Sequence, residues 1–209
     1  MNRKQIKTAL EKCLEDKGKR KFKQTVEFIV NYKGIDFTKP EKRLNLDIIL
    51  PKGRGKETNV VVFADGQMAL DAKNAGAQAI GGNQIPKLAK NKNELKRLAD
   101  HSEFLAEPKL MAVVGKNLGQ VLGTRKKLPK PVVGSVATAV EQARKRTRVA
   151  VKGKYLPVTQ CPVGSEDMDI EDLADNIETV YDRIKHSVSE ANIKSVYIKL
   201  TMGRAIKIV

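Results

Sequence analysis

The sequence predicts two units of different fold class. One is a discontinuous α+β domain made from both chain ends, residues 1–60 and 155–209, and the other is an inserted Rossmann-like parallel α/β domain, residues 61–154. Two observations favour this division. Apolar strands alternate with helices in the middle of the chain, which is typical of doubly wound parallel sheets. Each terminal segment alone has too few strands to close a core, so the economical solution joins them.

The N-terminal segment predicts one helix and two strands. The helix runs roughly from Arg3 to Asp16 and ends near Gly18, a residue that readily adopts the left-handed conformation. Residues 24–32, QTVEFIVNY, alternate and are rich in β-formers, and residues 44–51 make a second strand of the same antiparallel sheet. Cys13 falls on the apolar stripe of the helix, so we expect it in the core.

The C-terminal segment predicts a helix followed by a hairpin. Apolar residues recur at helical spacing from Ile170 to Val188. The last 15 residues, SVYIKLTMGRAIKIV, are typical of two strands joined by a turn at or near Gly203.

The middle of the chain changes from strand to helix several times. We expect a strand at 59–65, a helix at 66–76, a short strand at 77–82, a helical stretch at 83–99 and a buried strand at 110–115. No GxxxxGK[ST] sequence and no GxGxxG between strand and helix accompanies them, so the predicted α/β domain is a scaffold and not evidence of nucleotide chemistry.

Residues 114–134, VGKNLGQVLGTRKKLPKPVVG, combine regular glycines with a basic, proline-stiffened segment. A helix through Gly115, Gly119 and Gly123 would present a bare face to backbone or to a phosphate. The alternative is a tightly packed helix that leads into a solvated charged loop. The basic residues that follow are Arg125, Lys126, Lys127 and Lys130.

The charge of the chain indicates a polyanionic partner. There are 40 Lys and Arg against 24 Asp and Glu, a net charge of +16. The excess is uneven, because residues 155–209 carry 6 basic and 9 acidic side chains, and residues 165–182 hold eight carboxylates and no Lys or Arg. We expect that segment to face away from nucleic acid. The absence of Trp and the 4% aromatic content disfavour extended base-stacking platforms.

No catalytic or metal constellation stands out, so we expect no enzyme, no cofactor and no metal. His101 and His186 lie far apart in sequence, and Cys13 and Cys161 have no CxxC partner. The carboxylates from Glu166 to Asp172 suggest either a Mg²⁺ site or a helix start capped by Asp169, and we favour the helix start.

The chain has no apolar run of membrane-spanning length and no signal or transit pattern, so we expect a cytoplasmic protein without membrane contact.

Several short motifs occur in the order found in one known family. Besides residues 114–134 they are RKFKQTVE (20–27), GID (34–36), LP-G-GK (50–56), AGA then GG (75–82), CPVG (161–164), LADNI (173–177) and SVYIKLTMG (195–203). The chain resembles the family of large-subunit ribosomal proteins that form the mobile lateral stalk, the L-one family, in its archaeal form. It departs from the expected pattern at two positions, Thr124 and Arg204, where proline is common.

This resemblance implies an RNA-binding surface on the domain made from both termini. The family motifs map onto eight residues of this chain: Lys21, Phe22, Thr25, Glu27, Ser195, Thr201, Met202 and Gly203. The implied partner is large-subunit rRNA. The further implied roles are release of exit-site tRNA and repression of translation through the protein's own mRNA, and the free protein is expected to be a monomer. The alternatives left open are a non-ribosomal RNA-binding regulator or RNA chaperone, and a nucleotide-dependent enzyme.

The chemistry of these residues fits RNA, although each has an ordinary structural interpretation. A threonine hydroxyl can exchange hydrogen bonds with a ribose 2′-OH, glycine permits close backbone approach, and methionine and phenylalanine offer apolar surface to a base. Phe22 and Met202 could equally be core residues, and Thr201–Gly203 could be an ordinary hairpin turn.

Overall fold

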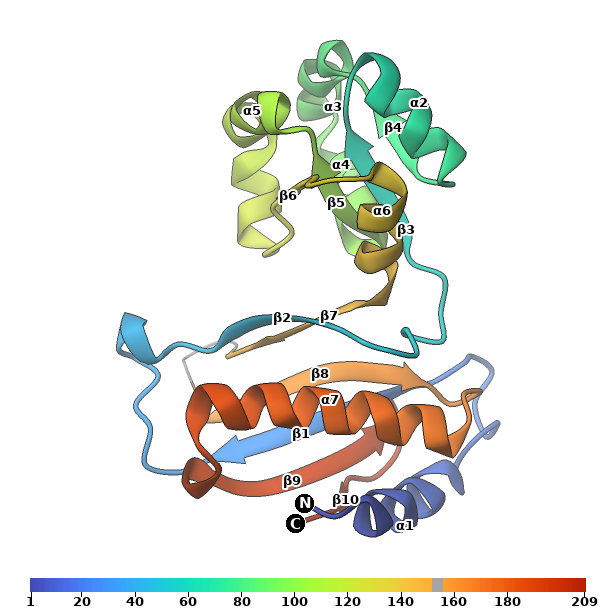
Figure 1. Cartoon of the computed structure of the whole chain (residues 1–209), viewed down its shortest axis with the longest axis vertical. Coiled ribbons are helices and arrows are strands. Elements are labelled where there is room, and N and C mark those ends of the chain that lie inside the picture. Colours follow the sequence, from blue (N-terminus) through green and yellow to red (C-terminus); the bar gives the residue numbers. More distant parts are fainter. Residues whose placement is uncertain (152–155) are drawn as a thin grey trace. The chain divides into compact units, whose positions relative to one another are not determined.

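The computed structural model describes residues 1–151 and 156–209, which form two compact units (Figure 1). Unit 1 comprises Met1–Lys56 and Lys145–Val209, and unit 2 comprises Glu57–Arg144. The helices are α1 (Arg3–Leu14), α2 (Gly66–Asn74), α3 (Ile85–Lys90), α4 (Lys92–His101), α5 (Met111–Thr124), α6 (Val136–Lys145) and α7 (Ile170–Val188). The strands are β1 (Thr25–Tyr32), β2 (Asn45–Ile49), β3 (Asn59–Phe63), β4 (Gln78–Ile80), β5 (Ser102–Ala106), β6 (Lys130–Pro131), β7 (Arg146–Ala150), β8 (Val158–Ser165), β9 (Ile193–Leu200) and β10 (Ile206–Lys207).

Unit 1 is built on an antiparallel sheet with the strand order β10-β9-β1-β8. Alternate residues of β1 are buried, as the sequence predicted, and they pack into one core with apolar residues of α1 and α7. Figure 1 shows α7 lying along these strands. The register pairs Val26 with Leu200 and Phe28 with Ile198, so the strands from the two chain ends share one apolar face. Cys13 is 4% exposed in this core, and burial raises the pKa of its thiol to about 11.

The strand predicted at 44–51 does not join the sheet of β1. It forms β2, which pairs in antiparallel fashion with β7 as a two-stranded ribbon, with Ile48 opposite Thr147. β1 is already paired with β8 on one edge and β9 on the other, so β2 cannot pair with β1 directly. Ile48 and Val149 are buried in the same core as the main sheet.

Unit 2 is a parallel sheet with the order β4-β3-β5-β6 and helices on both faces. Val61 and Phe63 of β3 pack with residues of α3, α4 and α5, whereas Val60 and Val62 pack with residues of α2 and α6. Alternate residues of a strand point to opposite faces, so a strand covered on both sides reads as a continuous apolar run. The doubly wound α/β fold class is confirmed.

One element prediction in unit 2 was wrong, and a second was confirmed with a division in its middle. Residues 110–115 are not a strand, because most of them begin α5, and the missed strand is β5. The buried residues of α5, Val114, Leu118 and Leu122, recur every fourth position, a helical period that the short window 110–115 could not reveal. The helical stretch at 83–99 is divided at Asn91, whose side chain accepts a hydrogen bond from the backbone of Glu94 and starts α4.

The compact units also differ from the predicted boundaries. Residues 145–151 were expected in the inserted domain, but β7 pairs with β2, and Val149 and Val151 belong to the core of unit 1. The predicted boundary between residues 154 and 155 itself lies outside the described residues.

Candidate RNA-binding surface

Most of the predicted site residues gather at one end of the main sheet of unit 1. β1 begins at Thr25, beside the point where β9 ends, and the turn Thr201–Gly203 follows β9 directly. The Thr25 N–H donates to Thr201 Oγ1 at 3.0 Å, and the Thr201 N–H donates to the Thr25 carbonyl at 3.1 Å. We call Lys21, Phe22, Thr25 and Thr201–Gly203 the sheet-end cluster.

The apolar members of the sheet-end cluster are exposed. Phe22 is 50% and Met202 is 58% exposed, so the interpretation of these two residues as core is wrong. Lys21 is also exposed. Gly203 closes the turn through its N–H, which donates to the Leu200 carbonyl at 2.9 Å. A Cβ at Gly203 would lie 3.1 Å from Leu200 Cβ, so the turn leaves little room for a side chain.

The Thr201 hydroxyl has a role inside the protein. Besides accepting from the Thr25 N–H, it can donate to the Thr25 carbonyl at 3.3 Å. A hydroxyl has one proton and two lone pairs, so only one acceptor position remains for a ligand. Thr201 therefore positions the turn in addition to any contact with a ribose.

Two of the predicted residues lie away from the turn or are already paired. Ser195 is 8% exposed, and its Oγ accepts from Asn31 Nδ2 at 3.0 Å near the opposite end of β9, six residues from Thr201. Glu27 accepts from Gln160 Nε2 and lies 3.8 Å from Lys199 Nζ. The structure does not bring Ser195 into the sheet-end cluster.

The four auxiliary basic residues lie in unit 2, after α5. Arg125 pairs with Asp100, and Lys127 pairs with Glu103 and also donates to the Ser102 carbonyl at 3.3 Å. Lys126 has a positive φ of 56°, and Lys130 begins β6. The charges of Arg125 and Lys127 are thus balanced locally.

Gln24 is a functional candidate that the sequence analysis missed. It is 1% exposed, and its Oε1 accepts the Met202 N–H at 3.1 Å. Its Nε2 lies 3.3 Å from both the Asp16 carbonyl and Glu166 Oε2, and Glu166 is 4% exposed. The signal was available, because Gln24 continues the buried period of β1 at Val26 and Phe28 and is therefore a polar residue on an inward face.

Lys56 is a second candidate that the sequence analysis missed. Its Nζ donates to the Lys23 carbonyl at 2.8 Å and to Thr25 Oγ1 at 2.9 Å. It therefore ties the loop after β2 to the sheet-end cluster. A lysine in a glycine-rich loop gave no sequence signal for this contact.

The acidic segment begins beside the sheet-end cluster. Lys23 Nζ lies 2.9 Å from Asp167 Oδ2, and this contact lowers the pKa of Asp167 and raises that of Lys23. Asp167 thus lies next to the sheet-end cluster, and the expectation that the acidic segment faces away from nucleic acid stays a prediction. Farther along, Asp169 is the N-cap residue of α7 and Glu171 lies in the first turn, as predicted, although the Asp169 side chain makes no capping hydrogen bond. In residues 1–151 and 156–209 no group of three or more His, Cys, Asp or Glu is arranged to hold a metal ion.

Fold and surface together define a class: a basic protein of one α+β unit and one α/β unit that presents lysines, exposed apolar side chains and a tight turn at a sheet end. The profile of the Ribosomal protein L1p/L10e family matches residues 10–204, so the chain belongs to that family. It is a structural protein and not an enzyme. Among the described residues no helix is long and apolar enough to cross a membrane.

Similar proteins cover nearly the whole chain. The "Large ribosomal subunit protein uL1" of Methanothermobacter thermautotrophicus is 41% identical over 209 residues, 98% of this chain and 99% of the relative. The protein of the same name from Thermococcus kodakarensis is 42% identical and covers 90% of this chain and 89% of its own length. That of Pyrococcus abyssi is 38% identical, with 99% and 96% covered. All three organisms are archaea, as the resemblance predicted.

Proposed function

We propose that the chain is a component of the large ribosomal subunit that binds a folded region of large-subunit rRNA through the sheet-end cluster of unit 1. The observation that supports this most is the exposure of Phe22 and Met202 beside a hydrogen-bonded turn in a strongly basic chain. Exposed apolar side chains at a fixed turn can contact bases or sugars, while lysines supply the salt-dependent attraction to phosphates.

The finer roles rest on the same surface. We propose that it also binds a similar structure in the protein's own mRNA and represses translation, and that the ribosome-bound protein helps exit-site tRNA to leave. We assign to Arg125, Lys126, Lys127 and Lys130 an auxiliary attraction to polyanions. Glu27 and Ser195 remain proposed contacts, and the free protein is proposed to be a monomer. Unit 1 is the proposed RNA-binding domain, with unit 2 as an insertion.

The test changes one exposed side chain. Met202→Asp removes an apolar contact and places an anion against phosphates, so specific rRNA affinity should fall at least tenfold, about 1.4 kcal/mol. Fold should be unaffected because Met202 is exposed. Binding to total rRNA and to random RNA is measured in parallel, together with co-sedimentation with large subunits.

Val133→Asp is the matched control, since Val133 is an exposed apolar residue of unit 2, 83% exposed, and the charge change is the same. If the two variants lose specific binding equally, the site has been assigned to the wrong part of the chain. If neither variant changes specific binding, the sheet-end cluster does not bind rRNA.

A further inference from the structure

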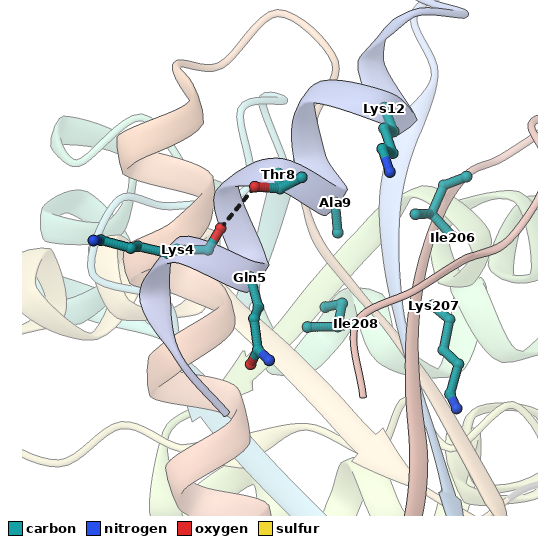
Figure 2. Close-up of a pocket in the computed structure, with 8 residues that line it drawn as sticks. All are labelled: Lys4, Gln5, Thr8, Ala9, Lys12, Ile206, Lys207 and Ile208. Carbon is teal, nitrogen blue, oxygen red and sulfur yellow. Dashed lines mark hydrogen bonds between the residues drawn. The ribbon is translucent and has the colours of Figure 1, made fainter.

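A groove between α1 and β10 presents cations that the protein itself does not neutralise. It has a volume of about 320 Å³ and is lined by Lys4, Gln5, Thr8, Ala9, Lys12, Ile206, Lys207 and Ile208, without any acidic residue. Figure 2 shows Gln5, Ala9 and Lys12 directed from α1 toward the segment 206–208, whereas Lys4 extends away from it. Lys12 therefore points toward the other wall of the groove, and Lys207 lines the groove while the end of its side chain extends away from α1.

The basic side chains of α1 are ion-paired on the side that faces α7 but not on the side that faces the groove. On the α7 side, Arg3 pairs with three carboxylates of α7, and Lys7 pairs with Glu171. Lys12 and Lys207 are exposed and have no ion pair anywhere in the described part of the chain. Glu11 and Glu15 lie on or at the end of α1, but neither lines the groove. The positive charge of the groove is thus available to bind an external anion.

The groove and the sheet-end cluster share one hairpin. The hairpin of β9 and β10 carries both the turn Thr201–Gly203 and Lys207, and Arg204 lies between them. Arg204 and Arg20 are close enough to Asp16 to help lower its pKa, although Lys19 has the largest effect. Asp16 follows Lys12 by four residues and lies just beyond the end of α1. Arg204 to Lys207 spans at most about 10 Å of extended chain. The hairpin thus carries two cations between the turn and the groove, Arg204 and Lys207, with the carboxylate of Asp16 near Arg204.

We propose that this groove holds the sugar-phosphate backbone of the same RNA strand that contacts the sheet-end cluster. The inference rests on the proposed function. The groove offers lysine ammonium groups and the Gln5 amide as donors, while the Thr8 hydroxyl donates to the Lys4 carbonyl and keeps its lone pairs for a ribose 2′-OH. An acidic protein segment would satisfy the charge, but it would not account for the hairpin that the groove shares with the turn.

The proposal predicts a change in salt dependence. Each phosphate contact contributes roughly 0.7 to 0.9 to the slope of log affinity against log salt, so the double variant Lys12→Gln/Lys207→Gln should lower the slope by about 1.4 to 1.8. At about 0.1 M salt, a slope change of this size corresponds to a loss of roughly 25- to 60-fold in affinity, if the double variant and the wild type bind equally at about 1 M salt. Specific binding to large-subunit rRNA is measured at several salt concentrations, and hydroxyl-radical footprints should lose a short stretch of backbone protection.

The matched control is Lys33→Gln/Lys194→Gln. Both residues are exposed, belong to unit 1 and lie by the opposite end of β1 and β9 from the turn, so the slope should stay close to that of the wild type. Lys12→Arg/Lys207→Arg should restore the slope. A wild-type slope in the groove variant, while Met202→Asp still abolishes specific binding, would overturn the groove and leave the proposed function intact.

Two further outcomes would contradict the groove proposal or the proposed function. Unchanged RNA affinity with weakened association with large subunits would mean that an acidic protein segment fills the groove, which contradicts the proposal. Wild-type protein that does not distinguish rRNA from random RNA would contradict the proposed function itself.

Discussion

Gln24 is hidden from solvent, yet its side chain connects three loops at the exposed sheet end. It accepts from Met202, donates toward Asp16 and lies beside the buried Glu166. A buried amide with both of its ends occupied fixes the geometry of its neighbours, because any rotation would leave a polar group unpaired. Gln24 is therefore a positioning residue for the turn and not itself an RNA contact.

Gln24→Glu tests that role through pH. The new carboxyl would lie beside Glu166 with little solvent, and both burial and the like charge raise its pKa in the folded state above its unfolded value. Stability and specific binding should therefore be reduced at neutral pH and recover as the pH falls through the raised pKa, when the protonated group again donates like the amide.

The specific rRNA affinity of the variant is measured relative to that of the wild type between about pH 7.5 and 5.5. An unperturbed Glu does not titrate in this range, whereas an unperturbed His does, so the wild type corrects for histidine. Gln24→Leu should bind weakly at every pH. If Gln24→Glu shows no pH dependence beyond that of the wild type, the amide does not position the turn.

At the level of elements, the periodicity of apolar residues predicted the structure well where a segment was long. The alternating burial of residues along β1 and the apolar face of α7 could both be predicted, because each element spans several periods. Residues 110–115 were misread as a strand because six residues cannot separate a helical from an extended period. The partner of β2 could not be predicted, since pairing is decided by which edges of β1 the distant strands occupy. The Gln24 contacts depend on three loops brought together by the fold.

Replacing glycine by alanine is expected to change the free energy of unfolding in opposite directions in two elements. A Cβ at Gly164 of β8 would collide with the Leu173 side chain of α7 and lie 2.9 Å from Met168 Sδ, so Gly164→Ala should lower the free energy of unfolding by about 1 to 3 kcal/mol. Gly119 of α5 has nothing within 4 Å of an added Cβ, so Gly119→Ala should raise it by up to about 1 kcal/mol.

Urea denaturation of both variants checks the pair. An added Cβ at Gly115, Gly119 or Gly123 meets nothing within 4 Å, whereas Val114, Leu118 and Leu122 of the same helix are buried in the core of unit 2. A loss of stability in Gly119→Ala would mean that the glycine face of α5 is in contact after all. An unchanged midpoint for Gly164→Ala would mean that β8 and α7 are not closely packed.

For the whole molecule, the question is whether unit 1 folds without unit 2. The ends to be joined lie near each other, because the Leu50 N–H donates to the Lys145 carbonyl at 3.0 Å and Lys56 is only six residues beyond Leu50. β7 returns the chain to unit 1 and contributes Val149 and Val151 to its core. A fragment that keeps β7 retains every strand of the two sheets of this unit that the structure describes.

Two deletions separate the observed boundary from the one predicted by the sequence. Replacing residues 57–144 with a Gly-Ser linker of about six residues should give a fragment that unfolds cooperatively and still binds rRNA specifically. Replacing residues 61–154 also removes β7, which exposes Ile48 and deletes two buried valines, so its free energy of unfolding should be lower by about 3 kcal/mol or more. Circular dichroism, urea titration and rRNA binding are compared for the two fragments. Equal stability would assign β7 to the insertion, whereas an unfolded 57–144 deletion would mean that unit 1 needs unit 2 to fold.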